Sequence, residues 1–281
     1  MSSEINAFEN SEFKNNEFEN NEFENSEIFT VVEDEVQKMG FLQRLASIFI
    51  APVKLMQNIK SYPVIASMLF LVMGLSLFTT PFIGRITEIT TNKMSEIMLI
   101  RYGQDFLSFI ESTQTATQAA ATSATTIITA ALVMLATYPI VCFLKALVLF
   151  IITKIARGEA KYRQYASMYA HVLIITVIGA LLTTPVMVAM GTLLDVSSLA
   201  AVFMPNGDFS MMSFNILTSI TLFSIVEIIL VGIGVKVLNG FSNTRTIVSV
   251  AVMFTLSVLF TAVMSGISVY MMDLSYKALR F

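Results

Sequence analysis

Two charged residues lie deep inside long apolar stretches, where an ionised side chain needs a partner before it can do any chemistry. Lys145 belongs to the stretch that ends at Lys154, and Glu227 belongs to the stretch that ends at Lys236. Each lies nine residues before that terminal lysine, which is about 13 Å along a helix. A lone ammonium or carboxylate at such depth in hydrocarbon is unfavourable by about 3 kcal/mol. We therefore expect Lys145 and Glu227 to form an ion pair near the middle of a membrane.

Two roles are open to such a pair. It is either a gate for an ion or a proton, or a pin that holds two helices in register. A gate normally needs a chain of titratable groups, and no third ionisable group lies as deep as Lys145 and Glu227. The sequence therefore favours the register pin.

Other residue types that support catalysis or metal binding are scarce. His171 is the only histidine, and a hydrogen bond to a neighbour near a helix end is its expected role. Cys142 is the only cysteine, and it is expected to act as a small apolar filler. A metal site needs several clustered ligands, and a covalent catalyst needs a nucleophile beside a base, but neither pattern occurs. We expect no catalytic residue, no metal site, no cofactor and no enzyme activity.

The composition indicates which elements must position these residues. Of the 281 residues, 55% are hydrophobic and 13% are charged, which is too apolar for an ordinary soluble domain. A membrane helix needs about 20 apolar residues. Five stretches meet that need, namely residues 63–82, 127–152, 167–190, 213–235 and 247–270. The sequence therefore predicts an all-α polytopic protein with five transmembrane helices in a membrane domain of residues 63–281.

Basic residues outside the five stretches predict the orientation. The amino-terminal segment and the loops after the second and fourth stretches hold eleven lysines and arginines. The loops after the first and third stretches, with the carboxyl-terminal segment, hold five. Because basic loops stay in the cytoplasm, we expect a cytoplasmic amino terminus and an outside carboxyl terminus in a bacterial-type plasma membrane.

Residues 1–40 are expected to form a disordered, acidic, low-complexity tail. Three five-residue repeats fill residues 11–25, and two of them read Asn-Glu-Phe-Glu-Asn. A period of five matches neither a helix nor a strand. Residues 1–35 hold eleven acidic residues and one lysine, which argues against nucleic-acid binding. The alternative to a plain solvated tail is a multivalent docking segment.

Residues 41–62 have apolar side chains at helical spacing, with basic residues between them. Arg44, Lys54 and Lys60 are expected on the wet side of a helix that lies in the membrane interface. Pro52 interrupts the pattern, so we expect two short helices that meet at Ala51 and Pro52. The alternative is a segment that packs against the cytoplasmic face of the protein itself, and the sequence leaves both open.

A shift of 82 residues places the second apolar stretch on the fourth. Lys145 then falls on Glu227, and Gly158 falls on Gly240. A duplicated helical hairpin would produce these matches, as transporters often show. Shared hydropathy alone would also produce such matches, so both explanations stay open.

Three parts of the chain resemble the Yip1 family of integral membrane proteins. They are residues 44–52, which end at Pro52, residues 158–165 between the second and third stretches, and residues 223–234 in the fourth. The resemblance implies five spans after a cytoplasmic amino-terminal tail. The Tyr-Gly-Pro element typical of eukaryotic relatives, which are associated with vesicle traffic and small GTPases, is missing. The chain is therefore most similar to the prokaryotic branch.

Together these features favour a non-catalytic membrane protein that organises membrane or protein partners, self-association included, in a trafficking-like or scaffold-like role. The rival hypothesis is a small-solute or ion transporter or channel built on Lys145 and Glu227. A transporter requires a polar path to mid-membrane, whereas an organiser depends on its amino-terminal 60 residues for its partners.

Overall fold

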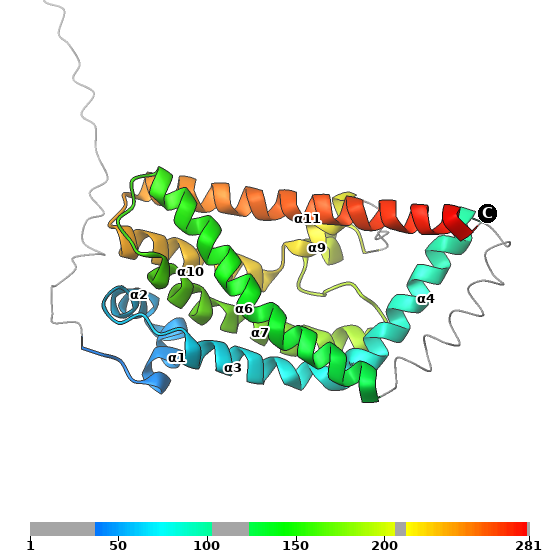
Figure 1. Cartoon of the computed structure of the whole chain (residues 1–281), viewed down its shortest axis with the longest axis horizontal. Coiled ribbons are helices and arrows are strands. Elements are labelled where there is room, and N and C mark those ends of the chain that lie inside the picture. The colour runs from blue at the N-terminus through cyan, green and yellow to red at the C-terminus, as the bar shows by residue number, and fades with distance from the viewer. Residues whose placement is uncertain (1–36, 103–123, 206–211, 280–281) are drawn as a thin grey trace, which may run out of the picture. The chain divides into compact units, whose positions relative to one another are not determined.

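A computed structural model describes residues 37–102, 124–205 and 212–279 (Figure 1), and the predicted tail therefore lies almost wholly outside the described residues. Within those ranges the regular structure is helical, apart from one isolated bridge between Ser198 and Thr221. The helices are α1 (Phe41–Ile50), α2 (Pro52–Ser61), α3 (Ala66–Ser76), η2 (Leu77–Phe82), α4 (Ile83–Tyr102), α6 (Ala124–Ile155), α7 (Tyr162–Met190), α8 (Leu199–Phe203), α9 (Met212–Ser219), α10 (Leu222–Asn239) and α11 (Asn243–Leu279). The predicted all-α class is confirmed.

Five helical segments in the described ranges are long and apolar enough to cross a membrane, as predicted. They are Ala66–Lys93, Ile128–Ile155, Tyr162–Met190, Leu222–Asn239 and Asn243–Met264. The orientation of the termini stays a prediction.

The first span continues beyond its predicted end at Phe82, because the chain absorbs Pro81 without breaking. Residues 77–82 tighten into the 3₁₀ helix η2, and α4 follows directly. A proline leaves the carbonyl four residues before it without its usual donor. Here the Thr80 hydroxyl donates to that carbonyl, the Leu77 oxygen, at 2.6 Å. Threonine beside proline therefore keeps this polar backbone satisfied inside an apolar segment.

The fourth span differs most from the prediction, which began it at Ser213 as one helix. The structure ends α9 at Ser219 and begins α10 at Leu222. Thr221 caps α10: its hydroxyl accepts a hydrogen bond from the Ser224 amide at 3.0 Å, and the Ser224 hydroxyl accepts one from the Thr221 amide at 2.8 Å. Such a capping box starts a new helix, and an average of hydropathy over these residues does not reveal it.

Helix α7 lies at the centre of the core and packs against α3, α6 and α10. Two glycines allow α7 and α10 to approach closely. A Cβ on Gly179 would lie 2.6 Å from the Phe223 ring, and one on Gly234 would overlap the Met168 sulfur. These close contacts fix the height of α10 against α7, and hence the height of the charged residue that α10 carries.

Candidate functional site

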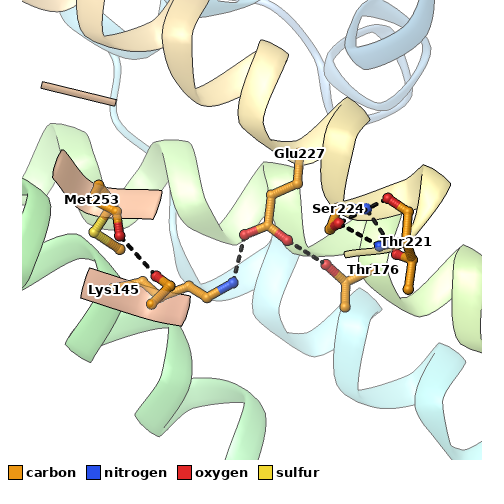
Figure 2. A network of polar contacts seen from close by, with 7 residues as sticks. Lys145, Thr176, Thr221, Ser224, Glu227 and Met253 are labelled. Carbon is orange, nitrogen blue, oxygen red and sulfur yellow. Dashed lines mark hydrogen bonds and ion pairs between the residues drawn. The ribbon is translucent and has the colours of Figure 1, made fainter. Parts of the chain in front are cut away.

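The structure brings Lys145 of α6 and Glu227 of α10 into direct contact. The Lys145 Nζ lies 2.6 Å from the Glu227 Oε1. Thr176 of α7 donates its hydroxyl to the other carboxylate oxygen at 3.0 Å, so Glu227 lies between Lys145 and Thr176 (Figure 2). These three residues, the polar trio, join three helices, and both carboxylate oxygens of Glu227 accept a hydrogen bond.

Helical periodicity explains why these side chains meet. On α6 the buried positions Cys142, Ala146 and Leu149 form one stripe, and Lys145 lies at its edge. Glu227 lies one turn before the buried residues Leu230 and Val231 of α10. The Lys145 side chain is accordingly 32% exposed and the Glu227 side chain 13% exposed.

The polar trio lies at a defined height above the end of the bundle where the α6–α7 and α10–α11 turns lie, here called the turn end. Helix α6 ends at Ile155 and α10 ends at Asn239, and a left-handed residue follows each, Arg157 with φ of 63° and Gly240 with φ of 64°. Asn239 joins the two turns: its Oδ1 accepts from the Ala160 amide at 3.2 Å, and its Nδ2 donates to the Tyr165 hydroxyl at 2.7 Å. Because the two turns are tied together, the equal nine-residue spacings to Lys154 and Lys236 place Lys145 and Glu227 at similar heights, about 13 Å before these two lysines.

The burial of the bundle changes at this same height. On α7 an unbroken run of buried residues from Tyr165 to Ile175 ends at the exposed Thr176. Among the described side chains, α6 has no buried residue before Cys142, and α10 has none before Leu230. Beyond Thr176 the buried residues of α7, Val177, Gly179 and Thr183, alternate with more exposed ones, so the polar trio lies where the continuous burial near the turn end stops.

The polar trio holds two opposite charges next to each other, which is an arrangement for an ion pair rather than for bond-breaking chemistry. The trio has a paired carboxylate and ammonium but no nucleophile beside a base. Over the described ranges no group of three histidine, cysteine, aspartate or glutamate residues could hold a metal ion. His171 is fully buried, and its Nδ1 lies 2.7 Å from the Ser167 carbonyl oxygen. Cys142 is also buried, with its thiol directed at the Ala166 carbonyl oxygen.

The second candidate site is the elbow, defined as α1 and α2 together. As predicted, two short helices meet at Ala51, and Pro52 is the first residue of α2. Helix α2 buries Leu55, Met56 and Ile59 against α7 and α10, so this half of the segment packs on the protein itself. The sequence did not decide whether residues 41–62 lie in the membrane interface or pack on the protein itself. The structure shows that α2 packs on the protein.

Arg44 is not on the wet side of the elbow as expected, and that prediction was wrong. Its side chain is buried, with 2% of the residue exposed. The guanidinium donates to the backbone oxygens of Met39 at 3.2 Å and Tyr62 at 3.0 Å. Burial lowers the pKa of Arg44 from its ordinary value, because desolvation disfavours the charged form. Arg44 therefore joins the chain before α1 to the chain after α2.

Lys54 and Lys60 are exposed, as predicted, and other polar contacts attach the elbow to the bundle. Gln164 donates its side-chain amide to the Lys60 carbonyl at 2.6 Å. Asn58, which the sequence reasoning did not single out, is fully buried and donates to the Gln37 carbonyl at 2.7 Å. The Gln164 contact attaches the elbow to α7, and the Asn58 contact attaches it to the chain before α1.

Helix α1 leaves a row of large apolar side chains uncovered. Its buried apolar residue is Ile48, whereas Ile50 is 83% exposed and Leu42 and Phe49 are also exposed. The exposed side chains lie on a helix that contributes one residue, Ile48, to the buried core. The elbow therefore combines a fixed base, α2, with an apolar outer surface, α1.

Sequence reasoning missed Thr176 and Asn239. Thr176 lies between Ile175 and Val177, and no pattern in the sequence tells which side of α7 meets Glu227. Asn239 has a weak signal, because an asparagine before Gly240 is typical of a helix end. Its role across the two turns depends on tertiary contacts.

A comparison with protein-family models matched the Yip1 domain over residues 46–264. The matched range runs from within α1 into α11 and includes the polar trio and Pro52. Comparisons with curated proteins and with solved structures gave no match.

Proposed function

Since the chain belongs to the Yip1 family of multi-pass membrane proteins, we propose that it is a non-catalytic organiser of protein or membrane partners in a bacterial-type plasma membrane. The observation that carries this proposal is the exposed apolar row of α1 on a fixed α2. An apolar helix face held at the end of a helical bundle is suited to bind a partner helix or to lie in the membrane interface.

Charge at the turn end supports a cytoplasmic position for the elbow. Lys54 and Lys60 of α2 are exposed there, as are Lys154, Lys161 and Arg163 around the α6–α7 turn. Basic residues next to membrane helices favour the cytoplasmic side and are attracted to anionic lipid headgroups. The elbow would therefore lie beside the inner leaflet.

A tryptophan probe tests whether α1 contacts lipid. The chain contains no tryptophan, so Phe49→Trp gives a single reporter on the exposed face of α1. In proteoliposomes with brominated acyl chains, we expect blue-shifted emission and strong quenching, because the indole enters the interface. Lys60→Trp is the matched control at an exposed polar position of the elbow, and it should be quenched much less.

A second set of variants tests for protein partners. Leu42→Ser with Ile50→Ser removes apolar surface from α1 without touching the buried residues of α2. Proteins captured with this double variant from crosslinked membranes are compared with those captured with two controls. One control is Phe70→Ser, at an exposed position on α3, and the other is a chain that lacks residues 1–35. If Phe49→Trp is not quenched and no partner depends on α1, the proposed function is wrong.

A transporter or channel is the second candidate, and the polar trio is the observation that favours it. Transport sites often lie near mid-membrane beside interrupted helices, and α10 begins at such an interruption, with Glu227 in its second turn. The test is ion or solute flux in proteoliposomes with Glu227→Gln as the variant. Flux that Glu227→Gln abolishes, in protein that remains folded at the temperature of the assay, would place this candidate first.

A further inference from the structure

Four helices form a closed ring of contacts around the polar trio. Helix α6 packs against α7 and α11, and α10 packs against the same two helices. Lys145 of α6 contacts Glu227 of α10 across this ring, and Thr176 joins them from α7. Met253 of α11 lies beside Lys145 (Figure 2). Each of the four helices therefore contributes a residue at the height of the trio, and the trio lies inside the ring.

The trio is partly exposed even though its side chains are on inward faces of their helices. Thr176 is exposed, and seven residues further along α7 Thr183 is buried. Seven residues bring a helix back to within about 20° of the same face. On α6, Lys145 lies between the buried residues Cys142 and Leu149, one turn away on either side, and its side chain is 32% exposed. The neighbouring helices therefore do not seal the trio completely.

Hydroxyl groups continue the inward faces toward the far end, which is the end of the bundle opposite to the turn end. On α10, Ser224 lies one turn beyond Glu227, and Thr221 lies one turn further. On α11, Ser257 lies one turn beyond Met253, and its hydroxyl donates to the Met253 carbonyl oxygen at 3.0 Å. All three hydroxyl residues are partly exposed. Toward the turn end the inward positions are instead apolar and buried, and they include Ala146, Leu149, Val231, Val235 and Val250.

We propose that water enters among α6, α7, α10 and α11 from the far end and reaches the polar trio, which is the closed bottom of this vestibule. Glu227 accepts one of the three donors of the Lys145 ammonium, and water accepts the others. The partly exposed hydroxyls provide the several polar partners that water in a protein needs. The buried run of α7 from Tyr165 to Ile175 closes the path toward the turn end. This inference depends on neither the elbow nor any flux, so it can hold or fail apart from both candidate functions.

Cysteine accessibility tests the vestibule on the full chain in membranes. Cys142→Ala removes the only native thiol, and Ser257→Cys then adds one thiol by exchanging a single atom. The probe is a charged, membrane-impermeant thiol reagent, which reacts with a thiolate that forms in water but not in hydrocarbon. The controls are Ile225→Cys on the exposed outer face of α10 and Val231→Cys at a buried position. We expect Ser257→Cys to react roughly tenfold faster than either control, and equal rates for Ser257→Cys and Ile225→Cys would overturn the proposal.

Two more variants test the side of entry and the depth of the vestibule. In sealed vesicles, Arg163→Cys at an exposed position of the turn end identifies the membrane face on which that end lies. Ser257→Cys should react with reagent added to the opposite face. Thr176→Cys, which keeps the ion pair, should react from that same face, because the vestibule reaches the trio. Labelling of Ser257→Cys from the Arg163 face, or a Thr176→Cys that reacts no faster than Ile225→Cys, would overturn the proposal.

Discussion

The contact between Lys145 and Glu227 predicts strong energetic coupling. Lys145→Met leaves the Glu227 carboxylate with the Thr176 hydroxyl as its remaining partner in the trio. An unpaired charge at this depth is unfavourable by about 3 kcal/mol, and the remaining hydrogen bond offsets part of it, so we expect a loss of about 2 kcal/mol in unfolding free energy. Glu227→Gln should lose a similar amount of unfolding free energy, because it leaves the Lys145 ammonium without its carboxylate partner.

The double variant should be no less stable than either single variant, because it leaves no unpaired charge. The coupling energy is then about 2 kcal/mol. Cys142 is the only cysteine and is buried, so its reaction with a thiol-reactive dye reports unfolding in detergent or bicelles. Thr176→Val is the control, expected to lose about 0.6 kcal/mol, the average for one such hydrogen bond.

Additive effects of Lys145→Met and Glu227→Gln, within about 0.3–0.5 kcal/mol, would refute this reasoning. They would mean that each charge is solvated independently. The register pin would then lose its basis.

Three further variants follow from close contacts. Gly158→Ala should destabilise the protein by about 1–3 kcal/mol, because its Cβ would lie 2.5 Å from the Asn239 Oδ1, and the same dye assay measures the loss. Arg44→Lys should release the segment before α1, because a lysine cannot donate in the planar fork that serves two carbonyls, and faster hydrogen exchange at the elbow would report it. Gly234→Val should separate α10 from α7 at Met168, with a loss of about 2 kcal/mol or more in the dye assay.

Each of these three predictions has its own contradicting result. A Gly158→Ala protein as stable as the parent would show that Asn239 does not hold the turns. Unchanged exchange in Arg44→Lys would mean that the two carbonyl contacts are dispensable. Full stability of Gly234→Val would mean that α10 and α7 do not pack as closely as described.

The fold was largely predictable, because hydrocarbon imposes simple rules on a sequence. Five apolar stretches predicted five spans, and Pro52 predicted the elbow. The spacing of Lys145 and Glu227 from their terminal lysines predicted equal depth, and the structure places the two side chains 2.6 Å apart. Helix length and rise are local quantities, so a sequence can reveal them.

The incorrect and missed predictions have two causes, one local and one tertiary. The predicted start of the fourth span was wrong because the cap of α10 depends on two hydroxyl residues, Thr221 and Ser224. An average of hydropathy merges these residues with their apolar neighbours. The prediction for Arg44 was wrong because it assumed that a charged side chain is exposed to water. In the structure two backbone carbonyls accept the hydrogen bonds of its guanidinium instead. Thr176 was missed because the rotation of α7 about its axis is set by packing. The environments of Arg44 and Thr176 thus depend on tertiary packing, whereas the Thr221–Ser224 capping box is local.

The interruption before α10 has a consequence for the surrounding bilayer. The 18 residues of α10 extend about 27 Å, whereas the 29 residues of α7 extend about 43 Å. A hydrocarbon layer about 30 Å thick cannot match both lengths. The bilayer would become thinner beside α10, while α7 would tilt to fit the hydrocarbon layer. The protein would therefore distort the membrane unevenly around its circumference, and it would collect in regions of matching thickness.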